Sequence, residues 1–111
     1  MSSEDRRYEY MQKLSHELDM QQDEIDQERK RLIREQQEAE DYFQEVRIAL
    51  NKELDKLPRR FSSQIQSCID SFEAEVSETE TQFDSSLQYL KKLRSDIYDD
   101  YIRKRDSYHA E

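Results

Sequence analysis

Apolar residues recur at every seventh position along the first half of the chain, and this repeat predicts a long helix. The repeat consists of Met11, Leu18, Ile25, Leu32, Ala39 and Val46. The companion positions of the same stripe are Leu14, Gln21, Glu28, Glu35, Tyr42 and Ala49. Because polar residues interrupt the companion series, the pattern predicts a helix over about residues 4–56 that packs weakly near its middle.

A second and cleaner repeat of seven follows in the other half of the chain. Its first position is occupied by Ile69, Val76, Phe83, Leu90 and Ile97. Its companion position is occupied by Ile65, Phe72 and Leu93, with Thr79 and Ser86 between them. This repeat predicts a second helix over about residues 59–106.

Pro58, the only proline, separates the two repeats within the stretch "ELDKLPRRF". Proline lacks the backbone N–H and its ring clashes with the preceding turn, so a helix ends or kinks just before it. Proline also suits the first turn of a new helix. The stretch by itself therefore leaves two arrangements open, a hairpin that turns near Leu57–Pro58 and a kinked rod.

The placement of charge favours the hairpin. Folding at about residue 57 brings the basic segment Lys91–Arg94 opposite Gln21–Glu24, with Asp19, Asp23, Glu24 and Asp26 close by. It also places the basic residues of the segment 29–34 beside Glu78, Glu80 and Asp84. A parallel dimer of rods would instead place each basic cluster against its own copy, with like charges facing. We therefore predict an all-α protein whose residues 1–111 form a single antiparallel two-helix hairpin of long, coiled-coil-like helices.

The composition argues against several classes of partner. The net charge is −9, which disfavours nucleic acid as a partner. No apolar run approaches the roughly 20 residues of a membrane span, so we expect no membrane insertion. The first ten residues lack the apolar core of a secretory signal, so we expect a cytoplasmic protein.

The sequence offers no candidate for catalysis. The two histidines, His16 and His109, lie at opposite ends of the chain and neither belongs to a Glu-x-x-His metal motif. Cys68 lies beside the apolar stripe and is predicted to be a small buried hydrophobic residue. Without glycine there is no phosphate-binding loop. We therefore expect a protein that is not an enzyme and has no catalytic, cofactor-binding or metal-binding residues.

Large apolar residues that lie off the two stripes predict a partner. A single hairpin with an interrupted seam has little core, and a second hairpin would complete a four-helix bundle. That second hairpin belongs either to another protein or to a second copy of the chain. The predicted partner-binding residues are Met20, Ile33, Phe43, Ile48, Leu50, Leu87, Tyr89, Tyr98 and Tyr101.

Two stretches carry a resemblance to a known family. They are "QQDEIDQERKRLIREQQEAEDYF" in the first helix and "FEAEVSETETQFDSSLQYLKKLRSDIYDDY" in the second. With them the chain resembles the small α-helical accessory proteins encoded beside LXG-type toxins of Gram-positive type VII secretion systems. The resemblance implies a targeting factor, or chaperone, that binds the helical N-terminal region of a toxin together with a second small helical protein related to WXG100 proteins and promotes toxin export.

The chain departs from WXG100 proteins themselves, because it has neither Trp nor Gly and carries "KLPRR" at the turn. No Tyr-x-x-x-Asp/Glu export signal begins at Tyr89, Tyr98 or Tyr101. The resemblance therefore implies the accessory partner, which would leave the cytoplasm only with a subunit that carries the signal. Two other functions fit the same pattern: a self-assembling homodimeric coiled-coil scaffold or tether, and a chaperone of another export system.

Overall fold

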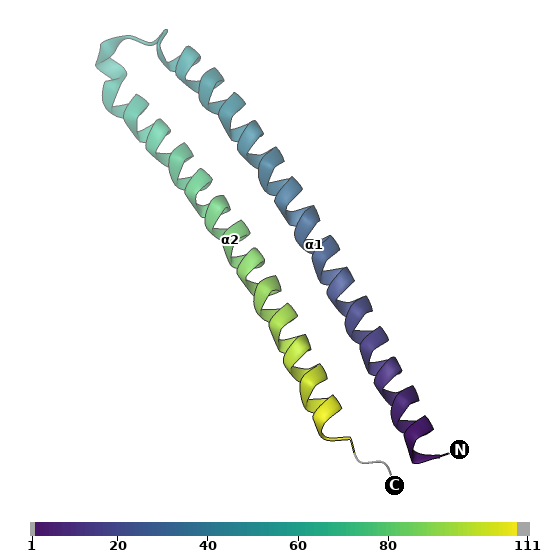
Figure 1. The fold of residues 1–111 in the computed structure, drawn as a ribbon. Coiled ribbons are helices and arrows are strands. Elements are labelled where there is room, and N and C mark those ends of the chain that lie inside the picture. The colour runs from purple at the N-terminus through teal and green to yellow at the C-terminus, as the bar shows by residue number, and fades with distance from the viewer. Residues whose placement is uncertain (1, 109–111) are drawn as a thin grey trace. The chain divides into compact units, whose positions relative to one another are not determined.

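The computed structural model describes residues 2–108 and contains two long helices (Figure 1). α1 spans Ser3–Leu54, a short 3-10 helix η1 spans Arg59–Phe61, and α2 spans Ser62–Asp106. The described residues contain no β-strand. The protein is therefore all-α, as the two repeats predict, and the residues between Leu54 and Ser62 form the turn rather than extending either helix.

Pro58 resolves the choice between a hairpin and a kinked rod. The N–H of Leu57 donates to the carbonyl of Leu54 at 3.1 Å, and the chain then leaves the helix. Pro58 is extended, with φ −61° and ψ 150°, and its carbonyl accepts the N–H of Phe61 at 3.0 Å to begin η1. The chain reverses here into a hairpin (Figure 1). Among residues 2–108 no backbone angle φ is positive, which explains how the turn forms without glycine.

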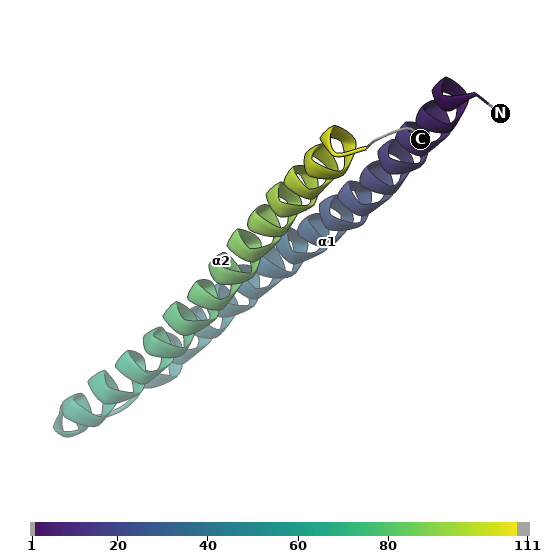
Figure 2. The ribbon, with the colours of Figure 1, turned by 90° about the horizontal axis from the view of Figure 1, so that it is seen from below.

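The paired helices divide into two compact units. The terminal unit comprises the described parts of Met1–Lys30 and Leu87–Glu111, and the turn unit comprises Arg31–Ser86. Within each unit a segment of α1 runs antiparallel to a segment of α2, and the two segments lie side by side in both views (Figures 1 and 2). Each unit therefore has the same construction, two helices with one interface between them.

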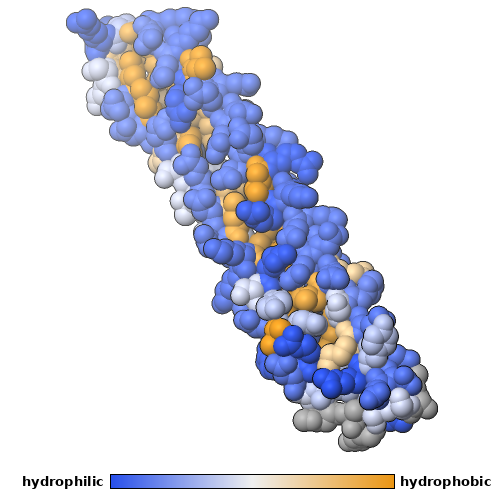
Figure 3. Space-filling model, in the orientation of Figure 1, coloured by the Kyte–Doolittle hydropathy of each residue, from blue (hydrophilic) through white to orange (hydrophobic). Residues whose placement is uncertain are grey.

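The core of both units is small. Four side chains of the described residues are buried, and none of them is less than 2% exposed. The four are Leu14, Ile25, Val76 and Leu90. All four occupy positions of the predicted stripes, and the hydrophobic residues visible in Figure 3 form a narrow, interrupted band between hydrophilic flanks. Because each long helix packs against one other long helix within residues 2–108, most stripe residues are no more than half-buried.

The stripe of α1 departs from the strict repeat of seven at Phe43. Tyr42, a predicted companion position, is 63% exposed. Phe43 is half-buried, and its ring packs edge-on against Phe72 of α2 with the centroids 6.3 Å apart. From Ala39 the half-buried apolar positions continue with Phe43, Val46, Leu50 and Leu54, which is fifteen residues in four steps. This average is longer than the 3.5-residue step of a repeat of seven and nearer to the 3.6-residue period of a straight helix. The prediction that Phe43 lies off the stripe is therefore wrong.

The same departure occurs in α2. Ser86, a predicted stripe position, is exposed, whereas Leu87 is half-buried. Leu87 lines the same hollow as the buried residues Ile25 and Leu90. The prediction that Leu87 lies off the stripe is wrong for the same physical reason, a four-residue step from Phe83.

Leu90 and Tyr89 provide a test of the stripe, because they are neighbours with opposite environments. Leu90 is 8% exposed and Tyr89 is 65% exposed. We expect Leu90→Ala to lower the free energy of unfolding by about 2–5 kcal/mol, since the substitution leaves a cavity beside Ile25. Tyr89→Ala should change it by less than about 0.5 kcal/mol. Thermal and urea unfolding followed by circular dichroism measures both, and equal losses would contradict this packing.

Candidate partner-binding surfaces

No group of three or more His, Cys, Asp or Glu residues that could hold a metal ion occurs among residues 2–108. His16 is exposed, and His109 lies outside the described residues. Cys68 is a free, exposed thiol, so the prediction that it is a buried hydrophobic residue is wrong. Cys68 precedes the stripe residue Ile69 by one position in α2. It therefore lies on a flank of α2 that α1 does not cover.

No helix within the described part of the chain combines the length and the apolar character required to cross a bilayer. This follows from the charge density of both helices.

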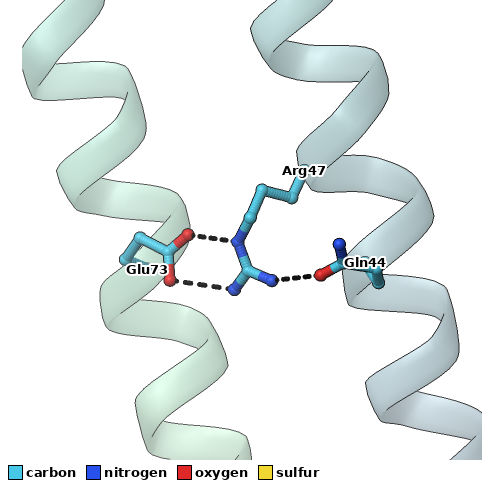
Figure 4. Close-up of polar contacts among 3 residues, drawn as sticks. All are labelled: Gln44, Arg47 and Glu73. Atoms are coloured by element: carbon cyan, nitrogen blue, oxygen red, sulfur yellow. Dashed lines mark hydrogen bonds and ion pairs between the residues drawn. The ribbon is translucent and has the colours of Figure 1, made fainter.

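An ion pair joins the two helices of the turn unit (Figure 4). Nε and Nη2 of Arg47 in α1 donate to the two carboxylate oxygens of Glu73 in α2, at 2.7 and 3.0 Å. Nη1 of Arg47 donates to Oε1 of Gln44 at 2.8 Å, which fixes the guanidinium plane. The hydrogen bonds from Arg47 lower the pKa of Glu73, and desolvation offsets only part of that effect. The paired geometry specifies which residues of the two helices lie opposite each other.

A second interhelical ion pair lies in the terminal unit. Nε of Arg94 in α2 donates to Oδ1 of Asp26 in α1 at 3.1 Å. Asp26 is one of the four acidic residues that the sequence predicts to lie close to the basic segment Lys91–Arg94. Both partners are about half-exposed, so the pair contributes more to register than to stability.

A hollow with basic rims runs between the helices of the terminal unit, and we call it the cationic groove. It consists of two adjoining depressions that share Lys91 and Arg94. Its principal lining residues are Ile25, Arg29, Leu87, Lys91, Arg94 and Tyr98. Apolar side chains from both helices form its floor, and basic side chains stand at its edges. Such a groove can accept the apolar side of another helix.

A smaller hollow lies beside the turn and is lined mostly by apolar side chains. Its lining residues are Leu54, Leu57, Phe61, Gln64 and Ile65. The guanidinium of Arg60 lies 4.9 Å from the centroid of the Phe61 ring. Leu57 is 47% exposed but was not among the predicted partner-binding residues. Its position between the two repeats could have predicted this exposure.

The nine predicted partner-binding residues do not gather on one surface. Five of them are exposed: Met20, Ile33, Ile48, Tyr89 and Tyr98. The other four are half-buried: Phe43, Leu50, Leu87 and Tyr101. Tyr89 and Tyr98 are nine residues apart, about two and a half helical turns, so they lie on opposite sides of α2. Leu87, Tyr98 and Tyr101 share one side of α2. Leu87 and Tyr98 line the cationic groove, and Tyr101 lies three residues beyond Tyr98 on the same side.

Three exposed aromatic residues, Tyr8, Tyr42 and Phe61, were not among the predicted partner-binding residues. Tyr8 is 64% exposed and lies near the start of α1. Tyr42 is 63% exposed because Phe43 takes the stripe position that the repeat of seven assigns to it. Counting in steps of four as well as three around Ala39 would have identified Tyr42 as a surface residue.

The ion pair between Arg47 and Glu73 predicts a pH-dependent contribution to stability. The folded-state pKa of Glu73 is lowered, so the contribution is present above the unfolded-state pKa of about 4.3 and is lost as the pH falls through the lower folded-state pKa. We expect Glu73→Gln to be less stable than the natural chain at pH 7, with the difference shrinking below about pH 4.3. Urea unfolding from pH 7 to pH 3 measures this, and a difference that does not change with pH would contradict it.

Comparisons with known proteins add no assignment. Neither a protein-family model, nor a curated protein, nor a solved structure matches the chain. The geometry and chemistry of the surfaces above therefore carry the functional interpretation.

Proposed function

We propose that the protein is an adaptor that binds helices of another protein along the apolar residues that its own two helices leave uncovered. One observation carries this proposal. Only four side chains of residues 2–108 are buried, whereas nine large hydrophobic side chains are each at least 37% exposed. Isolated exposed hydrophobic residues are ordinary, but so small a core beside so many of them favours a protein that completes its core by association.

The more specific form of the proposal is a targeting chaperone of a type VII secretion system. In this role the hairpin binds the helical N-terminal region of an LXG-type toxin in the cytoplasm, together with a second small helical protein related to WXG100 proteins. The resemblance of the two helix stretches and the hairpin arrangement support this role. The apolar stripes of the partners would form one continuous core, and complementary charges would set their register.

Two alternative functions would use the same exposed residues. In a homodimeric coiled-coil scaffold or tether, a second copy of the chain would cover them and no other protein would be needed. In a chaperone of another export system, the cargo would differ while the binding mode stayed the same.

Affinity purification of the tagged chain from its native host, followed by mass spectrometry, separates these functions. The targeting role requires near-stoichiometric recovery of a toxin with a helical N-terminal region and of a second small helical protein. Recovery of the chain alone, with light scattering giving the mass of a discrete dimer, would replace the adaptor with the self-assembling scaffold. A cargo of another export system would keep the adaptor and change its pathway.

Tyr98 and Phe43 separate partner binding from folding. Tyr98 is 49% exposed, whereas Phe43 packs against Phe72. We expect Tyr98→Glu to abolish recovery of the partner while leaving the helical circular dichroism signal unchanged, because the carboxylate would lie in the interface. Phe43→Glu should lower helicity and partner recovery together, because it places a charge between the helices. Full partner recovery by Tyr98→Glu would contradict the assignment of Tyr98 to the interface.

A further inference from the structure

We propose that the cationic groove binds an acidic amphipathic helix of the partner protein. This inference rests on the proposed adaptor function and specifies the chemistry of the segment that is bound. The floor of the groove is apolar, since the lining residues Ile25 and Leu90 are among the four buried side chains of residues 2–108. Leu87 is half-buried beside them and leaves part of its side chain available to a visiting apolar residue.

The charge of the groove is opposite to that of the protein. The chain as a whole carries a net charge of −9. The groove, in contrast, is edged by Arg29, Lys91 and Arg94, with Asp26 as its one acidic lining residue. Asp26 accepts a hydrogen bond from Arg94 at 3.1 Å, so these two charges compensate each other, and Arg29 and Lys91 give the groove its excess of positive charge. A partner segment with an apolar side flanked by carboxylates complements both the floor and the edges.

The side of α2 that borders the groove continues beyond it in the same pattern. Residues at successive spacings of four, three, four, three and four share this side: Leu87, Lys91, Arg94, Tyr98, Tyr101 and Arg105. Apolar or aromatic residues and basic residues are mixed along it, over about 27 Å at 1.5 Å per residue. The Tyr98 and Tyr101 rings lie 6.2 Å apart, and the guanidinium of Arg105, which also donates to Asp106, lies 5.9 Å from the centroid of the Tyr101 ring.

A helix fits this surface better than a polyanion or an anionic bilayer does. The groove lies between two antiparallel helices, α1 and α2. An elongated groove of this kind can accept the apolar stripe of one further helix. A nucleic acid or a lipid surface would extend past the groove and meet the acidic residues that give the chain its net negative charge. A helix with a few carboxylates on its flanks meets only the local basic edges. The charges would then determine orientation and partner choice, while Leu87 and Tyr98 contribute apolar contact.

Lys91 and Lys92 allow a matched test. They are adjacent, exposed and chemically identical, but only Lys91 lines the groove. The probe is a fluorescein-labelled 18-residue synthetic peptide that forms a helix with a leucine stripe flanked by glutamates. A second probe has lysine in place of every glutamate. Fluorescence anisotropy with the full chain measures the dissociation constant of each probe for the natural protein, Lys91→Glu and Lys92→Glu.

We expect the acidic probe to bind the natural chain and the basic probe to bind it at least roughly tenfold more weakly. Lys91→Glu should weaken the acidic probe by roughly tenfold, because it turns an attraction at the edge of the groove into a repulsion. Lys92→Glu should change the dissociation constant of the acidic probe by less than about twofold, although this variant has the same net charge as Lys91→Glu. Circular dichroism of both variants confirms that the helices are retained.

Four results would overturn the proposal. The first is no binding of the acidic probe, and the second is equal binding of the two probes. The third is an equal effect of the two lysine variants, which would indicate attraction by net charge alone. The fourth is a homodimer that dissociates in Lys91→Glu but not in Lys92→Glu, since a second copy of the chain would then occupy the groove.

Affinity purification with the same variants keeps this proposal distinct from the adaptor function. Recovery of one partner by the natural chain and by Lys91→Glu in equal amounts would leave the adaptor function standing and reject the groove. Recovery of no partner by the natural chain would reject the adaptor function itself, whatever the peptide probes show.

Discussion

The structure depends on one constraint: a helix with a single neighbour can bury only one narrow stripe of its surface. In both units the helices meet along one interface, and four side chains of residues 2–108 are buried there. The hydrophobic contribution to stability grows with the apolar area removed from water, so a core of this size leaves a small margin. The exposed apolar residues follow from the same constraint, because residues 2–108 supply no third long helix to cover them.

Ion pairs between the helices specify how α1 and α2 are aligned, which the small apolar core alone specifies less well. Arg47 with Glu73 and Arg94 with Asp26 join α1 to α2, one pair in each unit. Exposed ion pairs contribute little to stability, but a helix that shifts by one turn loses both hydrogen-bonded pairs, so they select one register. The same physical role extends to binding, because basic edges on an otherwise acidic protein discriminate among partner helices without requiring a large interface.

Most of the helix pairing could be predicted from periodicity, and the errors have a common cause. Counting by sevens assumes a supercoiled helix, whereas parts of both helices keep the 3.6-residue period. Phe43 and Leu87 therefore lie on the stripes, and Tyr42 and Ser86 lie on the surface. Cys68 was misplaced because closeness to a stripe in sequence does not ensure burial when only one side of the helix is covered.

The sequence by itself determined the helical class, most positions of the two stripes and the end of the first helix near Pro58, because these depend on local periodicity and on the missing N–H of proline. It also placed Lys91–Arg94 near a group of acidic residues that includes Asp26, because a hairpin that turns at Pro58 pairs each residue of α2 with a narrow range of positions in α1. Only the tertiary structure decided which basic residues share a groove and which face solvent. Lys91 and Lys92 are chemically identical neighbours. One residue of an α-helix corresponds to a rotation of about 100°, which places Lys91 at the groove and Lys92 outside it.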